Sequence, residues 1–366
     1  MLREKNKGIT LVALVVTIVI LLILAGISIS TLTNTGIFQK AKDAKKASEN
    51  AEKEQKQTLS EYEKELNKYT AKELTDDKIN KVLSETENIV LKDANGNIFT
   101  LPAGFKVVVN DDTGNAKTVD KGIVIEDATD AATKGSQFVW VPVGTIIKTD
   151  GTQVEIELNR YTFDEDGKPI PYGDAIIEND FSEIESRGNE IAKNIANFKD
   201  SIIVNDGYYI GRYEARKNDV TKKMTEVSSD TVYNDITQKE ASTVAKEMYN
   251  NTNYVSDLIN SYAWDTAIVF IQNCDESENY SKQCSSNKGY IESKGTNDDK
   301  KSNIFDMASN LREWSTETSS SDTLGPCTLR GGCGDYDWVM TSSRTYGEVT
   351  SRYNYLGFRP ILYINV

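Results

Sequence analysis

The sequence contains no histidine among its 366 residues, and this absence excludes whole classes of chemistry. A catalytic triad or dyad with an imidazole base is impossible, and so is a metal or haem site with a histidine ligand. Basic residues are in deficit too, since 42 Lys and Arg stand against 56 Asp and Glu, a formal net charge of −14. A nucleic-acid-binding protein needs a basic stripe to neutralise phosphates, so we expect no nucleic acid as a partner.

Cysteine is scarce as well, and the four cysteines are Cys274, Cys284, Cys327 and Cys333. They form no CxxC pair, which argues against a zinc ribbon, and they are too few for a disulfide-dense scaffold. We expect no metal site from them. Outside the cytoplasm they are disulfide candidates, with Cys327–Cys333 and Cys274–Cys284 as the expected pairs, although four cysteines allow three pairings.

Charge is also missing from one long stretch near the N-terminus. No charged residue lies between Lys7 and Lys40, and an apolar run begins at Ile9 and ends at Leu32. As a helix this run would be about 36 Å long, enough to cross a hydrocarbon core of roughly 30 Å. The basic flank before it predicts a single-pass protein of the cell membrane, anchored by residues 9–32, with its C-terminal part extracellular.

The start of this run, Lys-Gly-Ile-Thr-Leu-Val at residues 7–12, resembles the cleavage site of type IV prepilins and pseudopilins. The resemblance implies a leader at residues 1–8 and a transmembrane pilin helix at residues 9–33. It also implies cleavage by a prepilin peptidase between Gly8 and Ile9, N-methylation of the new terminus, and other pilins as partners. The fifth mature position, a glutamate in the main filament subunits of that family, is Ala13 here, so we do not expect the major subunit of a long pilus.

Two regions follow the apolar run. Residues 37–72 predict a helical stalk, because Leu59, Tyr62, Leu66 and Tyr69 recur at helical spacing in a stretch without Pro or Gly. A coiled-coil contact with another pilin is an alternative to a solvated helix. From residue 88 the period changes to two, and Asp-Asn-Gly clusters supply turns, which predicts a small β-rich collar over residues 85–132. These clusters lack the closing glutamate of an EF-hand calcium loop.

Residues 137–366 carry six motifs in order. They are Phe-Val-Trp-Val-Pro-Val-Gly at 138–144, Gly-Tyr-Tyr-Ile-Gly-Arg-Tyr-Glu at 207–214, Ser-Tyr-Ala-Trp at 261–264, Asn-Ile-Phe-Asp-Met-Ala-Ser-Asn-Leu-Arg-Glu-Trp at 303–314, Leu-Arg-Gly-Gly at 329–332 and Leu-Gly-Phe-Arg-Pro at 356–360. Together they resemble the formylglycine-generating-enzyme or sulfatase-modifying-factor domain, which implies a head with a variant C-type lectin fold. The whole chain is then expected to be an α+β protein of membrane helix, stalk, collar and head.

The residues of these motifs predict mainly structural roles. Trp140 and Trp314 bring large apolar area to a region otherwise rich in Ser, Asn and Asp, so we expect both in the core. Gly331 and Gly332 predict a backbone that turns sharply or passes close to another segment. Arg330 and Arg359 are expected to form buried ion pairs with Glu214 or Glu313.

Catalysis is not expected. The oxidase members of the resembled family bind copper through two closely spaced cysteines downstream of Arg-Gly-Gly, and here only Cys333 follows Gly332. We therefore expect no enzyme, with a formylglycine-generating-type oxidase kept as an alternative. Asn310 and Glu313 coincide with calcium-associated positions of that family, so a structural calcium ion is the one cofactor that the resemblance leaves open.

Residues 333–355 predict a ligand-binding face. This stretch holds four of the 18 tyrosines and no Lys, Leu, Ile or Ala, a composition that resembles a paratope more than a buried strand pair. An ordinary polar loop that happens to be rich in tyrosine is the alternative. The expected contact residues are Asp335, Tyr336, Asp337, Trp338, Arg344, Tyr346, Arg352, Tyr353, Asn354 and Tyr355.

These observations favour a non-catalytic, adhesin-like protein displayed at the cell surface, whose ligand is a protein or a glycan. The sharper hypothesis is a variable protein of a diversity-generating retroelement, because such proteins share the lectin-like fold and adenine-directed changes of Asn codons yield most residue types of this stretch. Trp338, Met340 and Glu348 cannot arise in that way, so only a subset of positions would vary. A structural minor pilin or pseudopilin, of a type IV pilus or a secretion filament, is the alternative.

Overall fold

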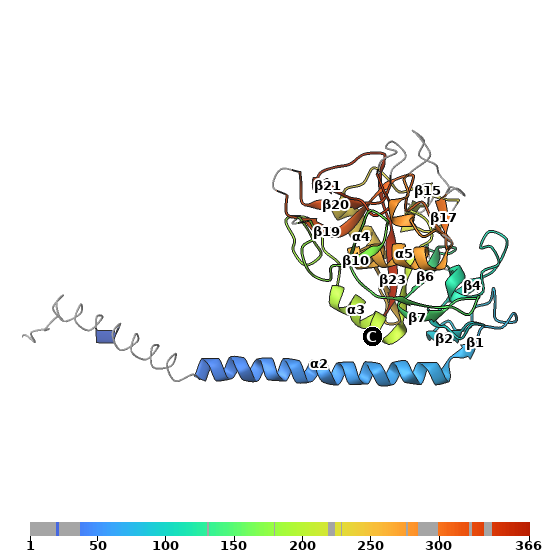
Figure 1. The fold of residues 1–366 in the computed structure, drawn as a ribbon, viewed down its shortest axis with the longest axis horizontal. Coiled ribbons are helices and arrows are strands. Elements are labelled where there is room, and N and C mark those ends of the chain that lie inside the picture. Colours follow the sequence, from blue (N-terminus) through green and yellow to red (C-terminus); the bar gives the residue numbers. More distant parts are fainter. Residues whose placement is uncertain are drawn as a thin grey trace, which may run out of the picture. The chain divides into compact units, whose positions relative to one another are not determined.

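The computed structural model describes residues 20–21, 37–129, 132–178, 180–218, 224–227, 229–275, 277–284, 299–321, 324–332 and 339–366. The chain divides into two compact units, Met1–Tyr62 and Glu63–Val366. Helix α2 covers Ile37–Thr70 (Figure 1). It begins in the first unit, and its residues from Glu63 onward belong to the second. The periodicity of residues 37–69 predicts a helix at this place.

The expected membrane topology needs correction. Among the residues that the structure describes, no helix is both long enough and apolar enough to cross a membrane. The expectation of a single-pass membrane protein with an extracellular head is overturned on this finding. The helix expected over residues 9–33 and the cleavage site at Gly8 and Ile9 fall, apart from Ile20 and Leu21, outside the described residues.

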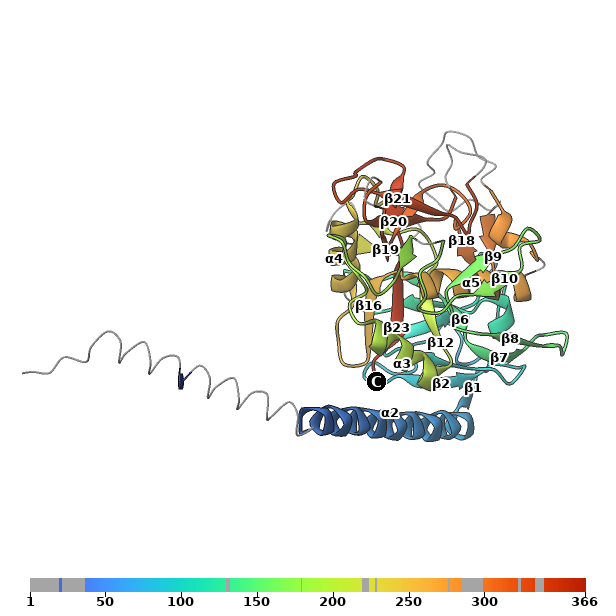
Figure 2. The ribbon, with the colours of Figure 1, turned by 60° about the vertical axis from the view of Figure 1, so that its left-hand side comes forward.

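The second unit is built on a six-stranded antiparallel sheet, with the order β16-β23-β12-β6-β5-β4. The sequences of these strands are alternating or continuous apolar runs, and most of their residues are buried. This is expected for a sheet that is covered on both faces. The red strand β23 lies in the middle of the second unit, which we call the head from here on, beside β12 (Figure 2). The bounds are β4 Phe105–Val108, β5 Val124–Asp127, β6 Gln137–Pro142, β12 Gly207–Gly211, β16 Tyr254–Leu258 and β23 Pro360–Ile364.

The expected fold class, with a separate collar between stalk and head, is therefore wrong. Strands β4 and β5 lie within residues 85–132, yet β5 pairs with β6 through Ile125 opposite Phe138, which makes both strands part of the head's main sheet. Only β2 (Ile89–Lys92) and β3 (Ile98–Leu101) form their own small sheet, together with β1 (Lys72–Glu73). Periodicity predicts a strand but does not reveal its distant partner, which is why this expectation failed.

A second sheet of five strands carries the C-terminal motifs. Its order is β11-β19-β20-β21, and β22 pairs with β19 in parallel. The eight residues of β19 form its centre and contain the Arg-Glu-Trp of the longest motif. The bounds are β11 Phe181–Ser182, β19 Arg312–Ser319, β20 Cys327–Arg330, β21 Arg344–Gly347 and β22 Leu356–Phe358.

Three helices of the second unit begin at side-chain caps, which satisfy free amide groups of the first turn. Asn194 caps α3 (Ile195–Asn205), Thr237 caps α4 (Gln238–Met248), and Asn260 caps α5 (Ser261–Cys274). Helix α5 is buried almost throughout, which fits its nearly continuous apolar sequence.

Short strands and turns complete this unit. They are β7 Gly144–Ile147, β8 Gln153–Ile156, β9 Tyr161–Phe163, β10 Pro169–Pro171, β13 Arg216–Lys217, β14 Met224–Thr225, β15 Thr231–Val232, β17 Lys300–Lys301 and β18 Ile304–Phe305, with 3₁₀ turns η1 at Val119–Lys121 and η2 at Tyr280–Lys282.

The core confirms the roles expected for the tryptophans and the paired glycines. Trp140 packs in the main core cluster, edge-on to Tyr209 with ring centroids 4.9 Å apart, and Trp314 lies in a second cluster. Gly331 has a φ of 81°, and a Cβ on Gly332 would overlap the carbonyl of Ala308. Both glycines are therefore required where β20 ends against the chain at residues 307–308.

A network of five charged side chains lies inside the second unit with almost no exposure to solvent. Glu317 of β19 binds Arg160 at 2.6 Å, Arg330 at 3.5 Å and Arg344 at 3.1 Å. Asp265 of α5 binds Arg330 at 2.5 Å and Arg344 at 2.6 Å. The network thus ties α5 to β19, β20 and β21, and it gives Arg330 partners other than the Glu214 or Glu313 expected from the sequence.

The electrostatics of Glu317 follow from this geometry. Burial by itself raises the pKa of this carboxyl, but the guanidinium groups of Arg344, Arg330 and Arg160 outweigh burial and lower the pKa to about 2. The carboxylate is therefore ionised at any ordinary pH. A separate buried pair joins Glu313 to Arg359 at 2.6 Å, as the sequence predicts for Arg359.

We predict that Glu317→Gln destabilises the protein by about 3–5 kcal/mol, because it leaves buried guanidinium groups without their shared counter-charge. Denaturant-induced unfolding measures this loss. The control Glu165→Gln removes an exposed carboxylate and should change the free energy of unfolding by less than about 0.5 kcal/mol. Equal stabilities of the two variants would contradict the role of the network.

A second prediction concerns Asp257 of β16, whose buried carboxylate accepts hydrogen bonds from the backbone amides of Lys193 and Leu258. Burial raises the pKa of Asp257 to about 7. Since the folded state holds this proton to higher pH than the unfolded chain, the stabilisation is complete near pH 4 and is lost as the pH rises toward 7. Asp257→Asn should flatten the fall of the unfolding free energy between these pH values, and an unchanged slope would refute this assignment.

Candidate functional site

The residues expected to form a ligand-binding face divide into three groups. Asp335, Tyr336, Asp337 and Trp338 lie outside the described residues, as does Cys333. Arg344 and Tyr346 belong to β21, inside the second sheet. Arg352, Tyr353, Asn354 and Tyr355 lie together in the segment between β21 and β22, and the candidate site is built around these four.

Arg344 faces the interior. Its side chain is 5% exposed, and its guanidinium is held by Asp265 and Glu317 in the buried network. It also donates to the carbonyl of Tyr161 at 3.1 Å. Arg344 therefore positions β21 and does not present its charge on the described surface, contrary to the expectation from sequence.

Tyr346 lies two residues after Arg344 in the same strand and is half-buried. Its ring stacks on Phe181 with centroids 5.1 Å apart, and its hydroxyl donates to Asp180 at 2.7 Å. This hydrogen bond to a carboxylate raises the pKa of Tyr346 to about 12. The side chain is thus held in one orientation, with part of its ring accessible.

Segment 352–355 is fastened to segment 233–236, which sequence analysis did not single out. The amide of Asp235 donates to the carbonyl of Tyr353 at 3.2 Å, and the side-chain amide of Asn234 donates to the carbonyl of Asn354. Arg352 donates to the carbonyl of Asp235 at 3.1 Å and pairs with Glu240 at 2.5 Å. The two segments therefore form one surface.

Glu240 is itself held by the start of α4. It is the third residue of a capping box, in which it accepts from the amide of Thr237 at 3.0 Å and from the hydroxyl of Thr237 at 2.7 Å. Hydrogen bonds from Thr237 and the pairing with Arg352 lower the pKa of Glu240. The Thr-x-x-Glu spacing was the one signal in the sequence that could have indicated this wall of the site.

Two tyrosines give the surface its aromatic character. The rings of Tyr353 and Tyr355 are stacked with centroids 5.2 Å apart and an interplanar angle of 1°. Tyr355 is partly buried against the second core cluster, whereas Tyr353 keeps 51% of its surface exposed. Tyr353 is therefore an aromatic ring that is held at the surface by the residue beneath it.

A groove of about 570 Å³ adjoins these residues. Its apolar walls include Tyr233, Ile236 and Val244, and the charged residues Lys217, Lys239 and Arg352 surround them. The ammonium group of Lys217 lies 4.9 Å from the centre of the Tyr233 ring. We call the groove together with residues 352–355 the tyrosine groove. It combines apolar area with polar groups at its rim, as ligand sites commonly do.

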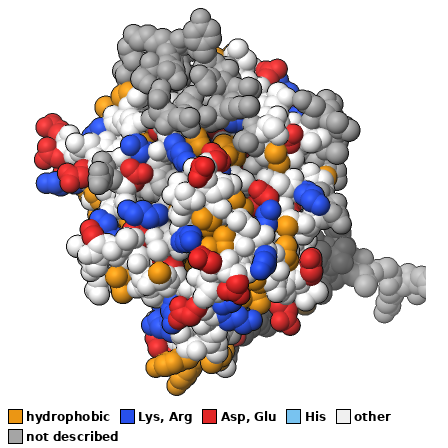
Figure 3. Space-filling model, turned by 90° about the vertical axis from the view of Figure 1, so that its right-hand side faces the viewer, with side chains coloured by type: hydrophobic (Ala, Val, Ile, Leu, Met, Phe, Trp, Pro, Cys, Tyr) orange, Lys and Arg blue, Asp and Glu red, His pale blue; other side chains and the backbone are white. Residues whose placement is uncertain are grey.

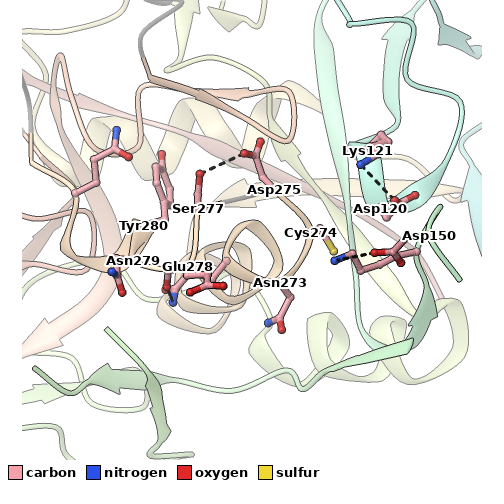
Figure 4. A pocket seen from close by; sticks show the side chains of 13 residues that line it. Asp120, Lys121, Asp150, Asn273, Cys274, Asp275, Ser277, Glu278, Asn279 and Tyr280 are labelled. Atoms are coloured by element: carbon pink, nitrogen blue, oxygen red, sulfur yellow. Dashed lines mark hydrogen bonds and ion pairs between the residues drawn. The ribbon is translucent and has the colours of Figure 1, made fainter. Parts of the chain in front are cut away.

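A second hollow, of about 640 Å³, lies at the end of α5 (Figure 4). The Nζ atom of Lys121 lies 3.7 Å from Oδ2 of Asp120, and that of Lys148 lies 3.9 Å from Oδ2 of Asp150. The ring of Tyr280 contributes to the lining, while its hydroxyl donates to Asp299 at 3.0 Å. The lysines here are neutralised by adjacent carboxylates, and the hollow has none of the exposed stacked aromatics of the tyrosine groove.

The expected disulfides are not formed. Cys274 and Cys327 are buried free thiols, so neither the Cys274–Cys284 nor the Cys327–Cys333 pair is present. Cys274 ends α5 in the main core, and Cys327 belongs to β20 in the second cluster, where each fills space as a small apolar residue. Burial raises the pKa of both thiols to about 12, so both are protonated at neutral pH.

The structure does not favour the calcium ion that the resemblance left open. The carboxylate of Glu313 is engaged by Arg359, and the side chain of Asn310 donates to Glu214. Over the described ranges, no group of three Cys, Asp or Glu residues is arranged to hold a metal ion. Asn310 and Glu313 thus have other partners and do not fit the expected calcium site.

No family model matches the chain, and no curated protein matches it. Among solved structures it is weakly similar to Treponema denticola variable protein 1, at 13% sequence identity and a TM-score of 0.33. The match covers 63% of this chain and 97% of that chain. A likeness this distant carries no argument about function, and the prepilin-like N-terminus is not shown by it.

We predict that Arg352→Ala loosens segment 352–355 without unfolding the head. Both partners of the Arg352–Glu240 pair are about half exposed, at 47% and 48%, so the loss of stability should stay below about 1 kcal/mol. Hydrogen exchange of the Asp235 and Leu356 amides, which donate to the Tyr353 carbonyl, should become faster. The control Lys239→Ala should leave both rates unchanged, and unchanged rates in Arg352→Ala would show that the pair does not hold the segment.

Proposed function

We propose that this protein is a non-catalytic, adhesin-like binding protein that captures a protein or glycan ligand at the tyrosine groove. The observation that carries the proposal is Tyr353, an aromatic ring that is half exposed, stacked on Tyr355 and flanked by Arg352. Tyrosine and arginine side chains supply much of the binding energy in protein interfaces, and Arg352 lines the groove beside Tyr353. A ring that is already ordered loses little entropy when it binds.

The surroundings of the groove support a polar or mixed ligand. Basic, acidic and hydrophobic side chains are interspersed on the face of the molecule drawn in Figure 3, so mixed charge is not peculiar to the groove. Around the groove itself, Lys217, Lys239 and Arg352 lie beside Asp235 and Glu240. This mixture of charge suits hydrogen-bonded recognition of a folded partner or a sugar better than binding to a polyanion.

A role as an oxidase has less support. Cys327 lies within β20 and is buried, and its thiol has a pKa of about 12, so it is a poor thiolate for copper or for redox chemistry. The proposal that the protein is no enzyme rests on this burial and on the sequence after Gly332, where Cys333 is the last cysteine.

Diversification by a retroelement is the finer part of the proposal. Its support is the composition of residues 333–355, together with the division that the structure makes within this stretch. Tyr353 and Asn354 are exposed, whereas Arg344 carries part of the buried network. Substitutions at Tyr353 and Asn354 change only exposed side chains, whereas a substitution at Arg344 would remove one member of the buried ion network.

The test of the function is ligand capture by the full chain and by Tyr353→Ala. Glycan arrays and a displayed peptide library serve as probes. We expect Tyr353→Ala to weaken capture at least tenfold, about 1.4 kcal/mol or more, because it removes the exposed aromatic ring beside the groove. The matched control is Tyr172→Ala, since Tyr172 is another partly exposed tyrosine, at 38%, and belongs neither to the groove nor to segment 352–355.

Thermal unfolding of both variants accompanies the binding measurement. Equal capture by the two variants would contradict a binding role for Tyr353. A large loss of stability in Tyr353→Ala would mean that the ring serves the core, and the proposal would then fail as well.

A further inference from the structure

Helix α2 (Ile37–Thr70) carries an exposed apolar stripe. Leu59, Tyr62, Leu66 and Tyr69 are 55%, 72%, 60% and 86% exposed, and their spacing of three, four and three residues places them on one face. Among the residues whose side chains are described, all those from position 39 to position 59 are exposed. An exposed stripe of this size on a long helix is typical of a surface that pairs with another helix.

The same face is continued by small residues toward the N-terminus of the helix. Ala41, Ala44, Ser48 and Ala51 have the same three-four-three spacing, and each lies 18 residues before its large counterpart (59 − 41 = 18). Because 18 residues make five turns of an α-helix, the small half and the large half of the stripe point in the same direction. Gln55 lies midway between them.

The two halves match when a second copy of α2 runs in the opposite direction. Every facing pair then has residue numbers that add up to 110, namely Ala41 with Tyr69, Ala44 with Leu66, Ser48 with Tyr62 and Ala51 with Leu59. Gln55 faces its own copy at the two-fold axis. Each large side chain thus meets a small one, which is the condition for close helix packing. A parallel pair would set tyrosine against tyrosine at one end and alanine against alanine at the other.

The area of the stripe supports the same arrangement. Eight large apolar side chains from two copies would bury on the order of 1,000 Å², which reaches the size of a specific interface.

We infer that α2 is a self-association element that pairs two copies of this chain as an antiparallel, two-fold symmetric dimer. The occupant of the stripe is the α2 helix of a second copy. The interface is isologous, so it closes at two copies and does not propagate into a filament. It also places the two Tyr69 residues about 42 Å apart along the helix pair, since 28 residues separate positions 41 and 69. The dimer would therefore be bivalent for any ligand of the head.

The test compares the molar mass of the full chain with that of a double variant, Tyr62→Glu with Leu66→Glu. Sedimentation equilibrium is measured in a detergent that keeps the apolar residues 9–32 dispersed. We expect a dimer for the parent chain and a monomer for the double variant, with at least a tenfold increase in the dissociation constant. The matched control, Ile170→Glu with Val349→Glu, changes two exposed apolar residues off the stripe, at 46% and 40% exposure, and should remain dimeric. Far-UV circular dichroism checks that α2 remains helical.

Cysteine cross-linking determines the direction of the pair. A mixture of Ala41→Cys and Tyr69→Cys chains should yield the mixed dimer, above the background that the parent chain shows from its native cysteines. A parallel pair would instead link Tyr69→Cys chains to one another. That result would overturn the inference, and so would a parent chain that is monomeric at every concentration measured or a double variant that stays dimeric.

Discussion

The structure depends on one buried electrostatic arrangement, in which Glu317 and Asp265 share the guanidinium groups of Arg160, Arg330 and Arg344. Three of these five residues lie in adjacent strands of the second sheet, and Asp265 lies in α5, which packs against the main sheet. Loss of one member leaves buried charge uncompensated, so the network makes a single packing arrangement much more favourable than its competitors. Its cost in desolvation is offset by hydrogen bonds on nearly every charged atom.

The network also explains how an ordered core can carry a surface that is free to change. Strand β21 is anchored through Arg344, and β22 is anchored beside β19, so both ends of segment 348–355 are held. Between these ends, Tyr353 and Asn354 accept hydrogen bonds from segment 233–236 through their backbone carbonyls, and the side chain of Arg352 binds the carbonyl of Asp235 and pairs with Glu240. Backbone contacts do not depend on side-chain identity, so different side chains at Tyr353 and Asn354 are compatible with the same fold.

Sequence reasoning was sufficient where the information is local or carried by large residues. The helical period of residues 37–69, the burial of Trp140 and Trp314, and the need for glycine at 331 and 332 all follow from single residues or short patterns. Glu313, one of the two partners expected for Arg359, does pair with it. The partners of Arg330 were missed because Asp265 and Glu317 are polar residues within an apolar helix and a strand, and only the tertiary fold brings them together. For the same reason the β4–β5 hairpin was assigned to a collar, and segment 233–236 was overlooked as the second wall of the groove.

The central claim is that Tyr353 and Asn354 belong to a binding surface and that their side chains are not needed by the fold. Deep sequencing of codons 333–355 in one cultured population tests it most directly. The account predicts adenine-directed substitutions at Tyr353 and Asn354, which are exposed, and invariance at Arg344, which is buried in the ion network. Substitutions that occur at Arg344 as often as at Tyr353, or a stretch that is invariant throughout, would contradict a diversified binding face.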